Sequence, residues 1–168
     1  MVDENNINVL TIGASSVNAF AGLNGGTEDE LGLKLSSTDE ASTDFALVLA
    51  SDKPVVGSTT PARKWTSLQA SVGSVEFVGI DDLTIAATNL SVEINKAYIN
   101  PTTKATSIID YAYVDEDGNS GLEVATGPDS SLTLSMDGSE GDLLSARGEL
   151  EIDLFGFFQV SGGFAFEK

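Results

Sequence analysis

Apolar and polar residues alternate with a period of two along most of the chain, and this alternation limits the folds open to it. Successive side chains of a β-strand point to opposite faces, so the pattern predicts strands with one apolar and one polar face. Helical periodicity is hard to find. Clear examples of the alternation are Phe45, Leu47, Leu49, Val75, Phe77, Leu150, Ile152 and Leu154. The chain is therefore predicted to be all-β.

Some of the predicted strands are long and contain a step of small or polar residues. The stretch "DLTIAATNLSVEIN" runs through Leu83 and Ile85, then a Thr-Asn step, then Leu90 and Val92. Long strands that bend at small residues favour an extended sheet over a tight barrel. A two-layer sandwich is the commoner outcome of such a pattern.

Segments rich in Gly, Pro, Asn and Asp separate the strands and supply turn geometry. The longest predicted loops are residues 24–30 and 52–64. Thr27 followed by Glu30 resembles a helix capping box, but Gly32 and the Leu-x-Leu spacing favour a strand there. We expect an all-β fold of long antiparallel strands, as an extended meander or a two-layer sandwich, with at most one short helix.

The residue inventory restricts the chemistry. A chain of 168 residues predicts a single domain with a core of its own. It has no Cys and no His, which removes disulfides, thiolate metal sites and the usual general base of hydrolases. We therefore expect no enzyme activity.

The net charge is −18, and this field repels nucleic acid and anionic membranes. The simplest role of such acidity is solubility. No apolar run is long enough to be a transmembrane segment. The start, "MVDENNINVL", lacks the basic and apolar regions of a signal peptide, so an export signal of the parent protein would lie outside this sequence.

Several stretches carry a resemblance to a known kind of protein. They are "VLTIGASSVNAFAGLNG", "DFALVLAS", "ARKWTSLQASVGSVEFVGIDDLTIAATNLSVEIN", "GLEVATGP" and "LLSARGELEIDLFGFFQVSGGFAFEK". In this order they resemble the tandem repeat module of very large secreted or surface proteins of bacteria, including cyanobacterial and marine ones. These proteins are adhesin-like and often carry haemolysin-type calcium-binding segments.

The resemblance implies that residues 1–168 are one β-rich module of a longer tandem array, with Lys168 at a junction with the next copy. It implies a secreted or cell-surface location and a role as a spacer or stalk element, with neighbouring copies of the module as partners. Members often have an Asp- and Gly-rich insertion after the "NAFAGLNG" equivalent. Here that place holds only "GTEDELG", which puts cation binding there in doubt.

The stretch "DEDGNSG" is the candidate metal loop, because hard cations such as Ca²⁺ need several oxygen ligands on a tight turn. Asp115, Asp117 and Asn119 alternate as the first ligands of an EF-hand do. The pattern then departs from the motif, since Ser120 stands where Gly belongs and Thr126 where Glu belongs. An acidic β-turn is the favoured interpretation, and Ca²⁺ is the alternative; otherwise we expect no cofactor.

Two further sets of side chains are candidates for a binding or catalytic site. Trp65, Tyr111 and Tyr113, with Tyr98, are the residues that could form a stacking platform for surface glycans, although half-burial of Trp65 at a strand end is the plainer interpretation. Glu149, Glu151 and Asp153 alternate with apolar residues and so belong on the outer face of a strand rather than in a catalytic cleft.

Five Phe residues near the end predict either core packing or an interface between modules. The favoured function is a non-catalytic structural or adhesive module. The alternatives are a carbohydrate- or Ca²⁺-binding module and a lipid-binding β-groove, for which a long sheet with a wholly apolar exposed face would be the signature.

Overall fold

The structure is a computed structural model of the chain. It describes residues 7–37, 41–54, 57, 59, 61–100, 103–104 and 107–168.

Strands account for nearly all of the regular structure. Their bounds are β1 (Ile7–Ala14), β2 (Ala19–Leu23), β3 (Leu31–Ser36), β4 (Asp44–Asp52), β5 (Lys64–Val78), β6 (Leu83–Asn100), β7 (Thr103–Lys104), β8 (Leu122–Gly127), β9 (Ser130–Leu134), β10 (Leu143–Leu154) and β11 (Phe158–Glu167). A single 3₁₀ turn, η2 (Gly138–Glu140), is the one helical element in the described part of the chain. The predicted all-β class is confirmed.

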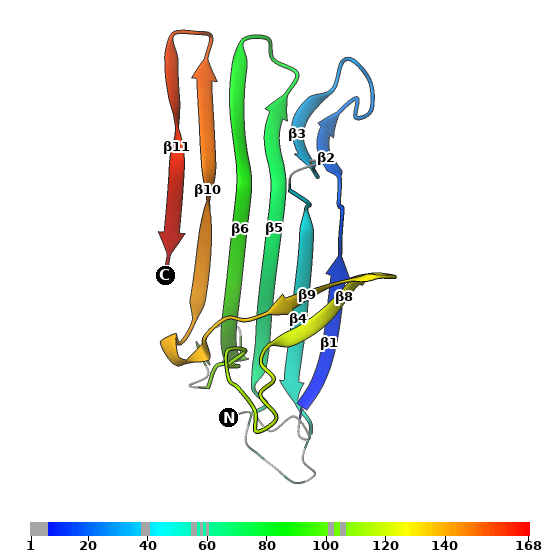
Figure 1. The fold of residues 1–168 in the computed structure, drawn as a ribbon, viewed down its shortest axis with the longest axis vertical. Helices are drawn as coiled ribbons and strands as arrows, with labels where there is room; N and C mark the ends of the chain where they lie inside the picture. The colour runs from blue at the N-terminus through cyan, green and yellow to red at the C-terminus, as the bar shows by residue number, and fades with distance from the viewer. Residues whose placement is uncertain are drawn as a thin grey trace.

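Nine of the described strands form one antiparallel sheet, in which six follow the order β1-β4-β5-β6-β10-β11 and β2, β3 and β7 pair beside this path, β7 with β6 (Figure 1). Both β4 and β3 pair with β5, β4 along its first part and β3 along its last part. Each of them carries an outer strand, β1 on β4 and β2 on β3. We call the end of the sheet where β5 begins the base, and the end with the β5–β6 turn the tip. The sheet has the extended form that the long, bent strands predict.

The loops fall where the sequence places them. Residues 24–30 connect β2 to β3, and residues 52–64 span the link from β4 to β5. The possible helix at Thr27 is absent, because the Thr27 hydroxyl donates to the Asn24 carbonyl and the Glu30 carboxylate accepts the Gly26 N–H within a turn. The segment after Glu30 is the strand β3, as its Leu-x-Leu spacing favours.

The β8–β9 hairpin crosses one face of the sheet near the base and makes the second layer (Figure 1). Its Val124 and Leu134 pack with Ala46 and Val48 of β4 into one buried cluster, and Ala50, Trp65 and Ala97 form another. The hairpin approaches β1 so closely that a Cβ added at Gly13 would lie 2.2 Å from the Ala125 carbonyl oxygen. Both buried clusters therefore lie on one face and at one end of the sheet.

A buried polar chain fixes the segment after β7 to the same face. The Tyr111 hydroxyl donates to the Ser67 hydroxyl, which donates to the side-chain oxygen of Asn95. The Asn95 amide in turn donates to the Ile109 carbonyl at 2.8 Å. Because each of these buried groups has a partner, the chain is stable in the core and fixes its geometry.

In β5 and β6, the alternate residues that face one side of the sheet switch from one set to the other at the same level, across the middle of the sheet. In β6, Asn89 has a φ of 51°, and the pairing with β10 shifts by one residue between Arg147 and Glu149. From one pair to the next, β6 advances three residues, from Ser91 to Thr88, while β10 advances two. The extra residue therefore forms a β-bulge in β6. The pairing of β5 with β6 keeps one register across this level. The alternation in β5 therefore changes at the same place, at Gly73.

Thr43 lies at the level where the alternation changes and bonds to both β5 and the end of β3. Its hydroxyl accepts the Gly73 N–H at 3.0 Å and donates to the Ser36 carbonyl at 3.1 Å. Its carbonyl accepts the Val17 N–H, which ties the link between β1 and β2 to the same point. Thr43 is 4% exposed, so these bonds form away from water.

The first prediction concerns Thr43. Thr43→Val keeps the shape of the side chain but leaves the Gly73 N–H without its acceptor, so we expect a loss of about 1–3 kcal/mol in the free energy of unfolding, measured by urea denaturation. Thr11→Val, at an exposed position of β1, is the matched control, with an expected change of at most about 0.5 kcal/mol. Equal losses in both variants would contradict the role of Thr43.

Candidate functional site: an uncovered apolar face

The register places apolar side chains opposite one another on the face that lies away from the hairpin. Residues paired across an antiparallel ladder share a face, and every second residue of a strand returns to it. One row across the sheet is Ile12, Leu47, Leu68, Ile94 and Leu144. None of the five is charged.

Applying the same pairing and alternation to all the strands extends this row into a face that covers the sheet from base to tip. The resulting apolar face consists of Leu10, Ile12, Ala14, Ala19, Ala21, Leu23, Leu31, Leu33, Leu35, Phe45, Leu47, Leu49, Leu68, Ala70, Val72, Val75, Phe77, Leu83, Ile85, Ala87, Leu90, Val92, Ile94, Leu144, Ala146, Leu150, Ile152, Leu154, Phe158, Val160, Phe164 and Phe166.

The described side chains of this face are exposed or half-buried, except that of Val72, which is buried. Leu23 is 65% exposed, Leu10 55% and Phe166 51%, and Ile85 and Val160 are also exposed. The buried clusters and the hairpin lie on the other side of the sheet. Exposed apolar patches on monomeric proteins rarely exceed a few hundred Å², so a patch that spans eight strands calls for a partner of some kind.

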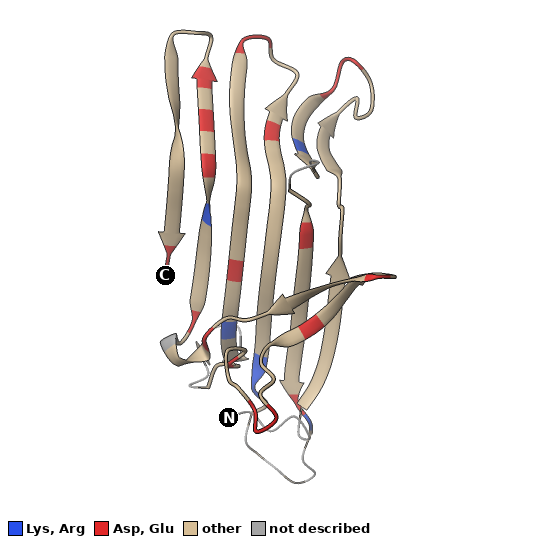
Figure 2. Ribbon diagram, viewed as in Figure 1, with Lys and Arg blue, Asp and Glu red and all other residues tan. Residues whose placement is uncertain are grey.

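The opposite face, which we call the polar face, carries the acids of the inner strands. Glu149, Glu151 and Asp153 of β10 lie on it beside Thr88 and Ala86 of β6. In Figure 2 these acids form a row of red bands on β10 near the tip. Glu149 accepts from the Thr88 hydroxyl and the Asn89 amide, at 3.4 and 3.5 Å.

The polar face is slightly hollowed near this row. The hollow has a volume of about 290 Å³, is open to solvent, and is lined by Glu149, Glu151, Ser161 and Gly163 among others. Asp153 is engaged in the β10–β11 turn, where it accepts the Gly156 N–H at 2.8 Å and the Gln159 amide at 2.6 Å. The row therefore offers water-facing acceptors, as the alternation with apolar residues predicts.

Two charged side chains that the structure describes on the apolar face are Lys64 and Lys96, both near the base, and Lys168, just past the end of β11, lies opposite Leu144 of the same face. Lys96 lies opposite Thr66, and Lys64 lies opposite Tyr98, whose hydroxyl is 3.0 Å from that of Thr66. No Asp or Glu of the described strands lies on this face. The acids near the tip, Asp81 and Asp82, lie in the β5–β6 turn.

The two outer edges of the sheet also have little charge. β1 pairs only with β4, β2 only with β3, and β11 only with β10, among the strands that the structure describes. The sequences of β1 (INVLTIGA) and β2 (AFAGL) contain no charged residue, and that of β11 (FQVSGGFAFE) contains only Glu167. Figure 2 shows the charged bands on the inner strands instead. Edge strands usually carry charges that prevent pairing with other chains, so these edges are unprotected.

The candidate metal loop is a turn closed by its first carboxylate. Asp115 accepts the backbone N–H groups of Asp117 and Asn119 at 2.9 and 2.8 Å, and the Asn119 side-chain amide donates to it as well. The Asn119 N–H and side chain hold the pKa of Asp115 below its ordinary value. No group of three or more acidic residues able to hold a metal ion occurs within the described ranges. The arrangement fits the acidic β-turn.

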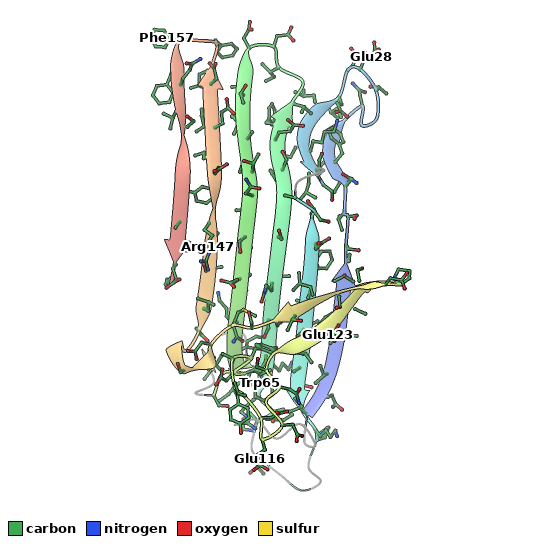
Figure 3. The ribbon with its side chains drawn as sticks, viewed as in Figure 1. Glu28, Trp65, Glu116, Glu123, Arg147 and Phe157 are labelled. Atoms are coloured by element: carbon green, nitrogen blue, oxygen red, sulfur yellow. The ribbon has the colours of Figure 1, made fainter. Side chains whose placement is uncertain are left out.

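The aromatic residues considered for sugar binding are not brought together on the surface. Trp65 is 1% exposed and donates its indole N–H to the Ser107 carbonyl, while the Arg63 guanidinium lies 5.0 Å from its ring centre. Tyr111 is 5% exposed within the buried polar chain, and Tyr113 is exposed. Figure 3 shows Trp65 beneath the segments that cover the base. Trp65 and Tyr111 therefore offer no free ring face to a sugar.

The Phe residues near the end of the chain lie largely in solvent. Phe157, at the β10–β11 turn, is 95% exposed and marks the tip in Figure 3. Phe155, Phe158 and Phe166 are exposed as well, while Phe164 is half-buried. Core packing, the first interpretation of this cluster, does not describe these side chains, and an interface remains the alternative that their exposure favours.

Sequence reasoning missed the two unprotected edges. Their signal was available, because the first predicted strand has no charged residue and the last has none before Glu167, whereas Lys, Glu and Asp interrupt the inner strands.

Comparison with protein-family models, curated proteins and solved structures gives no match. Of the described segments, none is a helix with the length and apolar character required to span a membrane.

The second prediction concerns the acidic turn. Because the Asp115 carboxylate already closes the turn, we expect Ca²⁺ and Mg²⁺ at matched ionic strength to raise the melting temperature slightly and equally, by screening an acidic surface. Asp115→Asn should lower the melting temperature by the same amount with and without Ca²⁺. A large shift with Ca²⁺ alone, abolished by Asp115→Asn, would establish a calcium site instead.

Proposed function

We propose that the protein is a non-catalytic structural module, a spacer or stalk element on the outside of a bacterium, whose copies join side by side into a longer sheet. The observation that carries this proposal is the pair of unpaired, nearly uncharged edges at the two sides of one long sheet. Unpaired N–H and C=O groups along such edges form a template for another strand.

The directions of the edge strands suit this kind of joining. Five antiparallel steps separate β1 from β11, so the two strands run in opposite directions (Figure 1). If β11 of one copy lies beside β1 and β2 of the next, the antiparallel alternation continues with every copy in the same orientation. The apolar faces of all copies then lie on the same side of the extended sheet.

The charge distribution supports the same arrangement. With a net charge of −18, most contacts between copies would bring carboxylates together. The edges are places where two copies can approach with little such repulsion, since their strands carry one charged residue, Glu167. The resemblance to tandem repeat modules supports copies of the same module as the natural neighbours, either within one chain or between chains.

The third prediction tests the edges. Ser161→Lys with Ala165→Lys places two charges on the polar face of β11, where the side chains are exposed and the fold tolerates them. We expect the unmodified protein to form elongated assemblies at about 0.15 M salt, where charges are screened beyond roughly 8 Å. The variant should raise the dissociation constant for this growth about tenfold, which corresponds to roughly 1.4 kcal/mol. Sedimentation velocity and electron microscopy measure the formation of these assemblies.

The matched control is Thr84→Lys with Ala86→Lys, which adds the same two charges to the same face of an inner strand, β6. This control should assemble like the unmodified protein, because the inner strand is not part of the joining edge. A control that impairs assembly as much as the edge variant would refute edge pairing, as would a protein that shows no elongated assembly at any concentration up to about 1 mM.

A further inference from the structure

The apolar face is a surface that edge-to-edge joining leaves uncovered, because neighbours in a longer sheet lie beside it and not over it. It holds about 30 side chains and no carboxylate. A standard protein–protein interface involves roughly 20–30 residues on each side. The face is therefore large enough for a stable interface with one other sheet.

We propose that the occupant of the apolar face is a second copy of this chain, packed face to face so that the two sheets form a sandwich. The interface is isologous, with the same surface contributed by both copies. Each sheet supplies an apolar layer, and two such layers interdigitate at a spacing of about 10 Å. This second interface is distinct from the edges and goes beyond the proposed side-by-side joining.

Charge identifies a second copy as the occupant. The acids of the inner strands lie on the polar face, so two apolar faces can meet without placing carboxylates against carboxylates. Elsewhere on the molecule, where most of the net charge of −18 is carried, such a meeting is repulsive.

The remaining charges also select the orientation of the two copies. Lys64 and Lys96 share the apolar face at the base, and Asp81 and Asp82 lie at the tip, in the turn that joins the same two strands. Figure 2 shows blue bands near the base of β5 and β6 and red in the turn at the tip, and the red bands within these strands belong to Glu76 and Glu93 of the polar face. When β5 and β6 of one copy lie antiparallel over β5 and β6 of the other, the lysines at the base of each copy face the aspartates at the tip of its partner. A parallel arrangement would place lysine over lysine.

A bound lipid fits this face less well than a second copy does. Six strands lie abreast at about 4.8 Å spacing, whereas one acyl chain is narrower than two such spacings and would leave most of the face wet. Lipid carriers bind their ligand in a groove or cavity. The hollows found in the described part of the chain are lined by the acidic row and by residues of β11 around Ser161.

The first test is a pair of variants at adjacent positions of β6. Ala87 lies on the apolar face between Val75 and Leu150, and Ala86 lies on the polar face between Glu76 and Glu151. Ala87→Lys and Ala86→Lys therefore add the same charge to the same strand on opposite faces. In the edge-blocked background of Ser161→Lys with Ala165→Lys, we expect a dimer by sedimentation equilibrium. Ala87→Lys should weaken it at least about 100-fold, because the face contact buries the charge without a partner, while Ala86→Lys leaves it unchanged.

The second test concerns the orientation and uses the half-buried Lys96 and the exposed Asp81. Lys96→Glu should weaken the dimer about fivefold by placing like charges together, and Asp81→Lys should do the same. The two changes combined in one chain should restore the affinity, because the contact reforms with its signs exchanged.

Three results would overturn the proposal. They are a monomer at all concentrations up to about 1 mM, a dimer equally impaired by Ala86→Lys and Ala87→Lys, and a monomer that native mass spectrometry finds carrying a co-purified amphiphile on an Ala87→Lys-sensitive site. The last result would assign the apolar face to lipid. The side-by-side joining is tested separately, since growth into elongated assemblies depends on Ser161 and Ala165 and the face dimer does not.

Discussion

The arrangement of the whole molecule depends on keeping one face of the sheet apolar over the full length of its strands. In β10 and β11 the alternation keeps one phase from base to tip, with Gly148 and Gly162 at two of the positions on the apolar face. In β6 the apolar residues change phase, from Leu83, Ile85 and Ala87 to Leu90, Val92 and Ile94, and a regular strand would send one of these sets to the polar face. The extra residue Asn89, with its positive φ, corrects the phase, and Gly73 does so in β5. Short strands end at the same level on the other side, where Thr43 bonds to both halves.

One face of this sheet is covered near the base and the other face is not covered, and the proposed function is inferred from this difference. On the polar face the hairpin, Trp65 and the buried polar chain of Tyr111, Ser67 and Asn95 give the base a true core. Toward the tip the same face carries acids in contact with water. The apolar face has no second layer among the described residues, although sheets normally bury such a surface because of the free energy gained on removing it from water. The base therefore has a core of its own while the apolar face is left uncovered, which is the arrangement that the proposed building unit requires.

Local patterns in the sequence were sufficient to predict the strands. They were not sufficient to predict which segments cover each face of the sheet. Alternation identified Leu150, Ile152 and Leu154 as one face and Glu149, Glu151 and Asp153 as the other, and the register confirms both. The Leu-x-Leu spacing identified β3 correctly beside a false helix signal at Thr27. Alternation cannot tell whether a second layer covers an apolar face, since that depends on contacts between distant segments. An extended sheet and a two-layer sandwich were therefore both expected from the sequence, the sandwich as the commoner outcome. The depth of Trp65 and Tyr111 was hidden for the same reason, because the segments that cover them come from residues 107–134, far along the chain.

The separation of charge limits which surfaces of this acidic and apolar chain can meet without repulsion between carboxylates. Hydrophobic attraction is non-directional, so an open face of about 30 apolar side chains would join any similar surface if nothing opposed it. The acids of the inner strands and turns oppose it on the polar face and at the tip, and they leave two kinds of surface free of that repulsion, namely the edges and the apolar face. Selectivity then arises as much from what the carboxylates exclude as from what the apolar residues attract. A chain with the same apolar content and neutral inner strands would lose this restriction, which gives the excess of Asp and Glu a structural role in addition to solubility.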